Sequence, residues 1–390
     1  MKKLFAFVLI LIFLVACQGT AKPVLVYRLS TGFDEPELLL SLQQNGVEIK
    51  LYGDSRNFDV NGSKVLFASG EIGNVAIWTV NTDGKNLKKI VDEKTVSTIA
   101  VETISRDGIG TYEAYSGVGL SWSPDGKKFA VAGFRKVCIF NADGTNEQCL
   151  TPKLDALNGR DCLDEDGLKI WQSRVEWSPD GSTIAVGSEW NWWAKPADGP
   201  STKNWIFLFR LEKDLFGNFK SSSVNVVDYA TYFAWSPDGS KLAYIYVHDL
   251  EPINIAMLNK LSVLDLKDMS SRDIIVIKSV DSLHYPTWSP NDKTIAVELY
   301  NSDTNISKIL SVDAGTGTAS ELKVNFPANS WYYNLTWSGD KIIFVSLYPD
   351  RGLERYSSQI VQLDPVTGQI MVLRDLGGNS TSTFEVGQMP

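Results

Sequence analysis

The sequence predicts an all-β fold, a single ring of four-stranded antiparallel blades of the kind called a β-propeller. Two observations predict it. A Trp-Ser-Pro-Asp-Gly motif recurs as near-copies every 49 to 64 residues, and short β-rich segments separated by tight turns surround each copy. Four short strands within about 50 residues are typical of one propeller blade. The copies begin at Phe58, Trp122, Trp177, Trp235, Trp288 and Trp337.

Each unit contains two tight turns. In the copy that starts at Trp235, Pro237 presets its φ angle and Gly239 supplies the positive φ that a tight turn often needs. A second hairpin follows in most units, as in residues 137–150, where two short apolar segments flank Asn-Ala-Asp-Gly. Outside the N-terminal leader, no long window has helical periodicity. We therefore expect strands throughout.

These two kinds of turn resemble those of the TolB-like, WD40-like (PD40) propeller repeat. The resemblance covers nearly the whole chain after the leader. It implies a propeller fold, and it suggests protein partners in the bacterial cell envelope. It does not assign an activity, because this fold carries many different functions.

The number of blades depends on the two ends of the chain. Residues 24–29, 37–42 and 47–52 are predicted to be strands two, three and four of one more blade. Residues 381–386 are predicted to supply its first strand, which would close the ring and leave no exposed sheet edge. We therefore predict seven blades, with six blades and a decorated terminus as the alternative.

The first 16 residues have the layout of a secretory signal, with Lys2 and Lys3 ahead of an apolar run. The run is too short for a comfortable membrane span. It ends in Leu-Val-Ala-Cys17, which resembles a bacterial lipobox and implies cleavage before Cys17 and lipidation of its thiol. An ordinary cleaved signal is the alternative. We expect a signal peptide over 1–16, a lipidated tether over 17–22 and the propeller over 23–390, on the extracytoplasmic side of a membrane.

The chain is acidic, with a formal net charge of −9. Cleavage would remove Lys2 and Lys3, which changes −9 to −11. A net negative charge argues against nucleic acid as a partner and against docking on anionic lipid. Membrane contact is therefore expected through the lipid alone.

Three cysteines remain after Cys17, and an exported protein can form disulfides. Cys138 and Cys149 flank the Asn-Ala-Asp-Gly turn symmetrically, so we predict that they lie opposite each other and form a disulfide. A bond between Cys149 and Cys162 is the alternative.

Propeller connectivity sorts the loops onto two faces. Connections between strands two and three and between blades share one face, here named the loop face, and the tight turns occupy the other. Loops on a rigid scaffold often carry function. The long insertions fall mostly on the loop face, at residues 92–116, 151–173, 189–204 and 247–259.

Aromatic residues mark two candidate binding segments on the loop face. Trp190, Trp192 and Trp193 lie outside the repeat pattern, and Tyr332 and Tyr333 precede the last Trp motif. Exposed aromatic side chains are favoured where a protein partner or a sugar ring is covered. The alternative interpretation for both groups is packing, over a blade core or at its rim.

The sequence offers little that indicates catalysis or a cofactor. His248 and His284 are the only histidines, with no metal-ligand spacing, and we interpret both as polar loop residues. The acidic segment 161–167 departs from a calcium loop, since Cys162 and Ser173 occupy ligand positions. We predict a non-catalytic protein-binding or scaffolding module without a metal or cofactor. A glycan-binding propeller and a carboxylate-dependent hydrolase are the alternatives.

Overall fold

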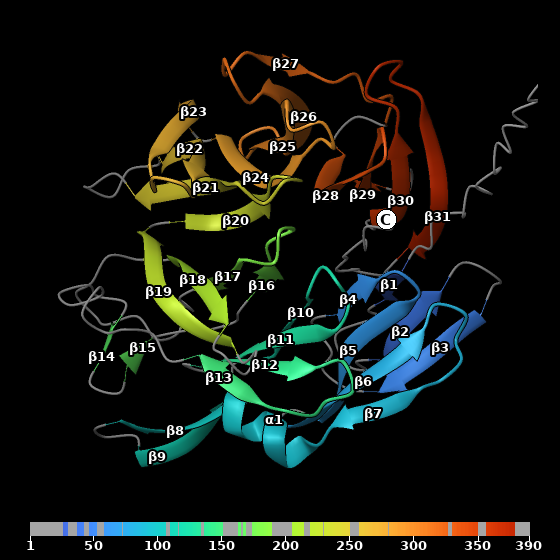
Figure 1. Ribbon diagram of the computed structural model, residues 1–390. Helices are drawn as coiled ribbons and strands as arrows, with labels where there is room; N and C mark the ends of the chain where they lie inside the picture. Colours follow the sequence, from blue (N-terminus) through green and yellow to red (C-terminus); the bar gives the residue numbers. More distant parts are fainter. Residues whose placement is uncertain are drawn as a thin grey trace, which may run out of the picture.

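The computed structural model is a ring of β-sheets (Figure 1). It describes residues 26–29, 37–42, 47–52, 58–71, 73–106, 110–115, 117–133, 136–150, 163–164, 167–168, 174–188, 205–213, 219–228, 230–249, 257–279, 281–326, 330–349 and 356–378.

Six four-stranded antiparallel sheets form the blades, and within each one the strands follow chain order. Blade 1 consists of β4 (Phe58–Asn61), β5 (Lys64–Glu71), β6 (Asn74–Asn81) and β7 (Lys88–Val91), and blade 2 of β10 (Gly119–Trp122), β11 (Lys128–Gly133), β12 (Lys136–Asn141) and β13 (Gln148–Leu150). Blade 3 consists of β16 (Arg174–Trp177), β17 (Thr183–Ser188), β18 (Trp205–Lys213) and β19 (Phe219–Asp228), and blade 4 of β20 (Ala230–Trp235), β21 (Lys241–Asp249), β22 (Met257–Asp265) and β23 (Ser271–Ser279). Blade 5 consists of β24 (Asp281–Trp288), β25 (Thr294–Asn301), β26 (Ile306–Asp313) and β27 (Ala319–Glu321), and blade 6 of β28 (Trp331–Ser338), β29 (Lys341–Pro349), β30 (Tyr356–Leu363) and β31 (Ile370–Gly378).

The predicted seventh blade is wrong, and the alternative count of six is right. The N-terminal segments do form β1 (Val26–Leu29), β2 (Glu37–Leu42) and β3 (Val47–Tyr52), paired antiparallel in that order. They make a three-stranded sheet whose β3 contacts β5 of the first blade (Figure 1). Within the described residues nothing supplies a fourth strand to this sheet, and the segment predicted to do so, 381–386, lies outside them.

The repeated turn has one hydrogen-bonding plan in four blades. The serine after each Trp donates its hydroxyl to the Asp or Asn two residues later, at 2.6–2.8 Å. The same hydroxyl accepts the backbone N–H five residues later, at 2.9–3.0 Å. In the two worn copies the strands instead join directly through two-residue loops, between Asn61 and Lys64 and between Ser338 and Lys341. The serines are Ser123, Ser178, Ser236 and Ser289.

The first strands of neighbouring blades contact one another: β10 contacts β4 and β16, and β24 contacts β20 and β28. The motif residues Trp122, Trp177, Trp235 and Trp288 are buried, as their place in the repeat predicts, and Trp337 of the worn copy is half-buried. The indole N–H of Trp288 donates to the carbonyl of Ala234 in the preceding blade at 3.2 Å. The apolar core is therefore shared across blade boundaries, which fixes the first strands relative to one another.

The insertion between the first two blades contains the helix α1 (Glu93–Ala100) and the hairpin of β8 (Val101–Arg106) and β9 (Gly110–Tyr115), which the sequence did not predict. Asp92 caps the helix by accepting the N–H of Thr95 at 2.8 Å. The helix buries Val96, Ile99 and Ala100 and contacts β6, β11 and β12. Among the described residues, no helix is long and apolar enough to span a membrane.

The acidic segment after the second blade forms a small hairpin of β14 (Leu163–Asp164) and β15 (Gly167–Leu168). Its strands pair Asp164 with Gly167. Cys162 and Ser173, which occupy ligand positions in the calcium-loop alignment, lie outside the described residues.

Candidate functional site

The first strands of blades 4, 5 and 6 share an irregularity three residues before the motif Trp. The register shifts around Tyr232 in β20, Tyr285 in β24 and Asn334 in β28. Tyr285 and Asn334 have φ angles of 51° and 55°. A bulky residue in the left-handed region is uncommon and costs free energy, so the surrounding structure must hold it there. A bulge of this kind re-aims the neighbouring side chains.

The bulge in β24 places His284 beside Glu298. These two residues are cross-strand partners between β24 and β25. His284 Nδ1 lies 3.2 Å from Glu298 Oε2, and the Ser307 hydroxyl donates to Glu298 Oε1 at 2.5 Å. The Glu298 side chain is 5% exposed and that of His284 is 28% exposed. A buried carboxylate is therefore covered by a half-buried imidazole.

The hydrogen bond to Glu298 orients the imidazole of His284. A carboxylate only accepts hydrogen bonds when ionised, so Nδ1 carries the proton and Nε2 presents a lone pair in the neutral ring. Among the described residues Nε2 has no hydrogen-bond partner. In the neutral ring it is therefore an open acceptor, and the hydrogen bond between Nδ1 and Glu298 fixes its direction.

Tyrosines surround this pair. The ring centroids of Tyr232, Tyr285 and Tyr300 lie 5.5, 6.0 and 6.4 Å from that of His284. The three tyrosines are half-buried, and the Tyr300 hydroxyl donates to Asn305 at 2.8 Å. Burial raises the pKa of Tyr285 well above its ordinary value, and Tyr232 and Glu298 add to that rise. The phenol of Tyr285 is therefore neutral at physiological pH.

The predicted residues Tyr332 and Tyr333 have different surroundings. Tyr332 is buried and packs edge-on against Phe344, with centroids 5.1 Å apart, so its ring belongs to the blade core. Tyr333 is half-buried, and burial together with the Glu298 carboxylate raises its pKa to about 12. Its ring packs against Val345 and Ile360 of its own blade. The cluster in blades 4 and 5 is hereafter the tyrosine–histidine–glutamate site, composed of Tyr232, His284, Tyr285, Glu298 and Tyr300.

The site lies toward the loop face. Tyr300 is near the end of β25, next to the connection to β26, while His284 lies in the middle of β24. By propeller connectivity the Tyr300 side of the site is nearer the face that carries the long insertions. Trp190, Trp192 and Trp193, predicted to bind on this face, lie outside the described residues, as does Cys17.

Sequence reasoning missed this site. It interpreted His248 and His284 as polar loop residues, which is wrong, because His248 is paired within β21 and His284 within β24. The available signal was Glu298. When the repeats are aligned on their Trp motifs, the equivalent positions in four other blades hold apolar residues or glycine: Ala132, Gly187, Ile245 and Val345. A lone acidic residue at a core position of a repeat indicates a function or a specific partner.

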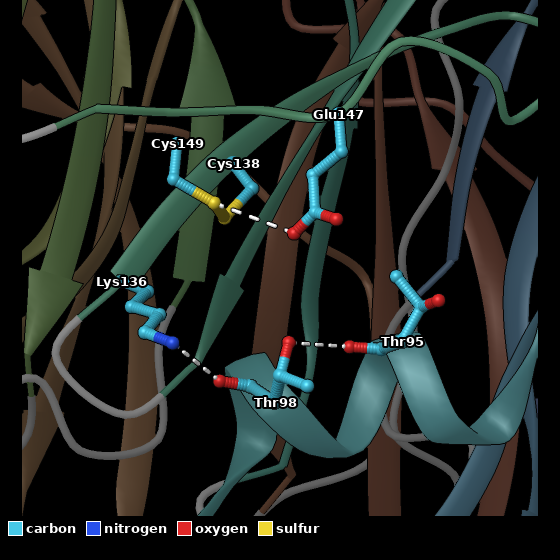
Figure 2. Close-up of a disulfide and its surroundings, with 6 residues drawn as sticks. All are labelled: Thr95, Thr98, Lys136, Cys138, Glu147 and Cys149. Carbon is cyan, nitrogen blue, oxygen red and sulfur yellow. Dashed lines mark hydrogen bonds between the residues drawn. A yellow bond between two sulfur atoms is a disulfide. The ribbon is translucent and has the colours of Figure 1, made fainter.

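The disulfide joins Cys138 and Cys149, the pair predicted from the symmetric turn (Figure 2). The two cysteines are cross-strand partners between β12 and β13, and Glu147 Oε1 lies 3.4 Å from Cys149 Sγ. These three residues bring ligand-type atoms together, but the sulfurs are bonded to each other and offer no thiolates to a metal. Lys136 on the same strand donates to the carbonyl of Thr98, which ties α1 to the blade.

No family model matches the chain, and no curated protein matches it. Solved structures do. An oligogalacturonate lyase from Vibrio parahaemolyticus is 13% identical, with a TM-score of 0.55, over 90% of this chain and 86% of that one. An acylaminoacyl peptidase from Pyrococcus horikoshii is 12% identical, with a TM-score of 0.50, over 82% of this chain and 45% of that one.

A putative TolB from Agrobacterium tumefaciens is 16% identical, with a TM-score of 0.44, over 73% of this chain and 98% of that one. The chain has a β-propeller fold. These similarities are all below 25% identity, so they establish the fold alone and leave the activity to be argued from the site.

Proposed function

We propose that the protein is a lipid-anchored, extracytoplasmic β-propeller that acts as a non-catalytic protein-binding or scaffolding module of the bacterial cell envelope. The observation that carries the proposal is the tyrosine–histidine–glutamate site. Partly exposed aromatic rings over a buried polar pair are what protein interfaces use as anchors, since aromatic side chains combine large apolar area with a polar group.

The scaffold suits passive binding. The first strands of blades 4 to 6 are held by shared core packing, so the rings keep their positions without a partner. A preorganised surface loses little entropy on binding. The disulfide between Cys138 and Cys149 supports an oxidising compartment, because such bonds persist mainly outside the cytoplasm. The lipobox-like sequence at Cys17 supplies the anchor in this proposal.

Affinity capture from a gently solubilised native envelope tests the proposal. Tyr300→Ala removes a ring at the site, and the triple change of Trp190, Trp192 and Trp193 to Ala removes the aromatic loop. The matched control is Val366→Ala, because Val366 is 92% exposed in the turn between β30 and β31, on the opposite face. We expect one protein to be retained by the wild type and the control and lost by Tyr300→Ala. Capture that none of the variants changes contradicts the proposal.

Glycan binding is the second candidate, and one observation favours it. Tyr232, Tyr285 and Tyr300 present both apolar ring surface and phenol groups within one small area. Sugar rings stack on such surfaces and hydrogen-bond to their polar edges. Soluble oligosaccharides that saturably quench the intrinsic fluorescence of the wild type, and fail to do so with Tyr300→Ala, would support this function over protein binding.

A further inference from the structure

We infer that the tyrosine–histidine–glutamate site is a docking point for a cationic side chain, a primary ammonium group such as that of lysine, presented by the protein partner. The inference rests on the proposed function and specifies the chemistry of that partner. It follows from the buried charge of Glu298, the open acceptor of His284 and the ring of tyrosines around them.

The first step is the charge of Glu298. Its side chain is 5% exposed, and its two oxygens are engaged by Ser307 and His284. No lysine or arginine forms an ion pair with it among the residues that the structure describes. A buried carboxylate is costly unless a positive charge compensates it. When the His284 imidazole is neutral, the His284–Glu298 pair carries a net negative charge that a bound cation would balance.

The second step is the acceptor of His284. Because Nδ1 donates to Glu298, Nε2 presents its lone pair outward, as described above. An N–H group of an ammonium ion is the complementary donor. The Glu298 carboxylate behind the ring polarises the imidazole and strengthens it as an acceptor, as it does for oriented histidines elsewhere. A ligand that must accept hydrogen bonds from the protein would not be complementary to this nitrogen.

The third step is the ring surface. Tyr232, Tyr285 and Tyr300 have their centroids within 6.4 Å of the imidazole, so a group that reaches Nε2 also meets aromatic rings. The faces of such rings attract cations through the ring quadrupole. Burial and the neighbouring Tyr232 raise the pKa of the Tyr285 phenol, so this group stays neutral beside a bound cation. An anionic ligand would meet both this negative ring surface and Glu298, so the site disfavours it.

The whole chain reinforces the local charge. The net negative charge, −9 for the full sequence and −11 after the proposed cleavage, attracts a basic partner from solution. The site would then fix one cationic side chain of that partner at a defined position. Electrostatic attraction supplies the encounter, and the oriented Glu298–His284 pair supplies the selectivity for an N–H donor with a positive charge.

Nuclear magnetic resonance of the full folded chain tests the inference directly, because His248 and His284 are the only two histidines. The probe is Nα-acetyl-lysine amide, and its control is the same compound with the side-chain amine acetylated, which is neutral. We expect the His284 imidazole signal to shift saturably with the cationic probe and to stay unchanged with the neutral one, while His248 stays unchanged with both. Equal shifts with the two compounds would overturn the inference.

Glu298→Gln removes the buried charge and keeps the shape, so we expect at least a tenfold weaker response to the cationic probe. Unchanged affinity in this variant contradicts the inference. If Glu298→Gln does not fold, Tyr300→Leu replaces it as the test, and full affinity there is the contrary result. Oligosaccharides that shift His284 where the amine does not also overturn the inference. If envelope capture persists in Glu298→Gln, the proposed function stands and only the cation site fails.

Discussion

Asp59 of the first blade accepts a hydrogen bond from the backbone N–H of Trp122 in the second blade, with 2.6 Å between Oδ2 and N. Its other oxygen accepts the N–H of Val60 at 2.7 Å. In the next pair of blades the Ser121 hydroxyl plays the same part, accepting the N–H of Trp177 at 2.9 Å. In both pairs of blades a side chain next to the motif position, Asp59 after Phe58 and Ser121 before Trp122, links one first strand to the next, and in blade 1 this link carries a titratable group.

Asp59 makes the stability of the protein depend on pH. Burial raises its pKa from 3.8 to about 6, against the lowering effect of the two backbone N–H groups. Because the folded pKa exceeds the unfolded one, this contribution to stability is fully present below pH 3.8 and is lost as the pH rises through about 6. We expect the wild type to lose on the order of 2–3 kcal/mol more than Asp59→Asn between pH 4 and pH 7.

Chemical denaturation at a series of pH values measures this difference. The Asn side chain has one acceptor oxygen in place of two, but the lost hydrogen bond costs the same at every pH, so the pH dependence of the difference isolates the ionisation. Parallel stability curves for the two proteins would show that Asp59 does not titrate in this range.

The serine of the repeated turn stabilises the blade more than the equivalent serine of the worn turn. Ser236 is fully buried, donates to Asp238 at 2.7 Å and accepts the Lys241 N–H at 2.9 Å. Ser236→Ala leaves that buried N–H without its side-chain acceptor, at a cost of about 1–3 kcal/mol in unfolding free energy. Ser338 has no side-chain hydrogen bond among the described residues, so Ser338→Ala should cost less than about 0.5 kcal/mol. Thermal unfolding of the two variants measures both losses. Equal losses of unfolding free energy would contradict the prediction.

Gly144 is required by close packing between blades 1 and 2. It has a φ of 86°, and a Cβ atom there would overlap the carbonyl oxygen of Ile90. We expect Gly144→Ala to lower the unfolding free energy by about 2–4 kcal/mol, because both the backbone and the neighbouring strand must shift. Gly62→Ala is the control, since it has a φ of 57° with open space around it. Its cost should stay near 1 kcal/mol, from the backbone alone. Similar costs for both would rule out the packing explanation.

The Cys138–Cys149 disulfide closes a short loop, with a sequence separation of 11. We expect reduction to lower the unfolding free energy by about 2–3 kcal/mol, chiefly by freeing the unfolded chain. Cys149 is the position to change, because it is the exposed partner while Cys138 is buried. Cys149→Ser should reproduce that loss and respond no further to reductant. A wild type whose denaturation curve is unaffected by reductant would show that the bond does not form or does not stabilise the fold.

Much of the fold could be predicted from the repeat. The turn at Trp235 is local chemistry, in which Pro, Asp and Gly each have a defined conformational role, so its copies mark the blades wherever they occur. The count of seven failed because pairing residues 24–52 with 381–386 is a non-local event that no local pattern specifies. The helix α1 was not predicted, because its eight residues are too few to show a clear helical period and because its stability depends on packing against β6 and β11.

The site was harder to predict than the fold. Tyr333 could be selected from the sequence as an aromatic residue near the loop face, but in the folded protein its ring packs against Val345 and Ile360 of its own blade. The pairing of His284 with Glu298 depends on the β24–β25 register and on the bulge at Tyr285, and both emerge only in the folded sheet. An alignment of the repeats would have located the site, because Glu298 occupies a position where four other blades have apolar residues or glycine.

Site-specific photo-crosslinking in the native envelope tests the central claim most directly. A photoreactive amino acid is placed at Tyr300, in the tyrosine–histidine–glutamate site, or at Val366, which is exposed on the opposite face. The account predicts one discrete protein adduct from position 300 and none from position 366. An adduct from position 366 alone, or the same adducts from both positions, would contradict it.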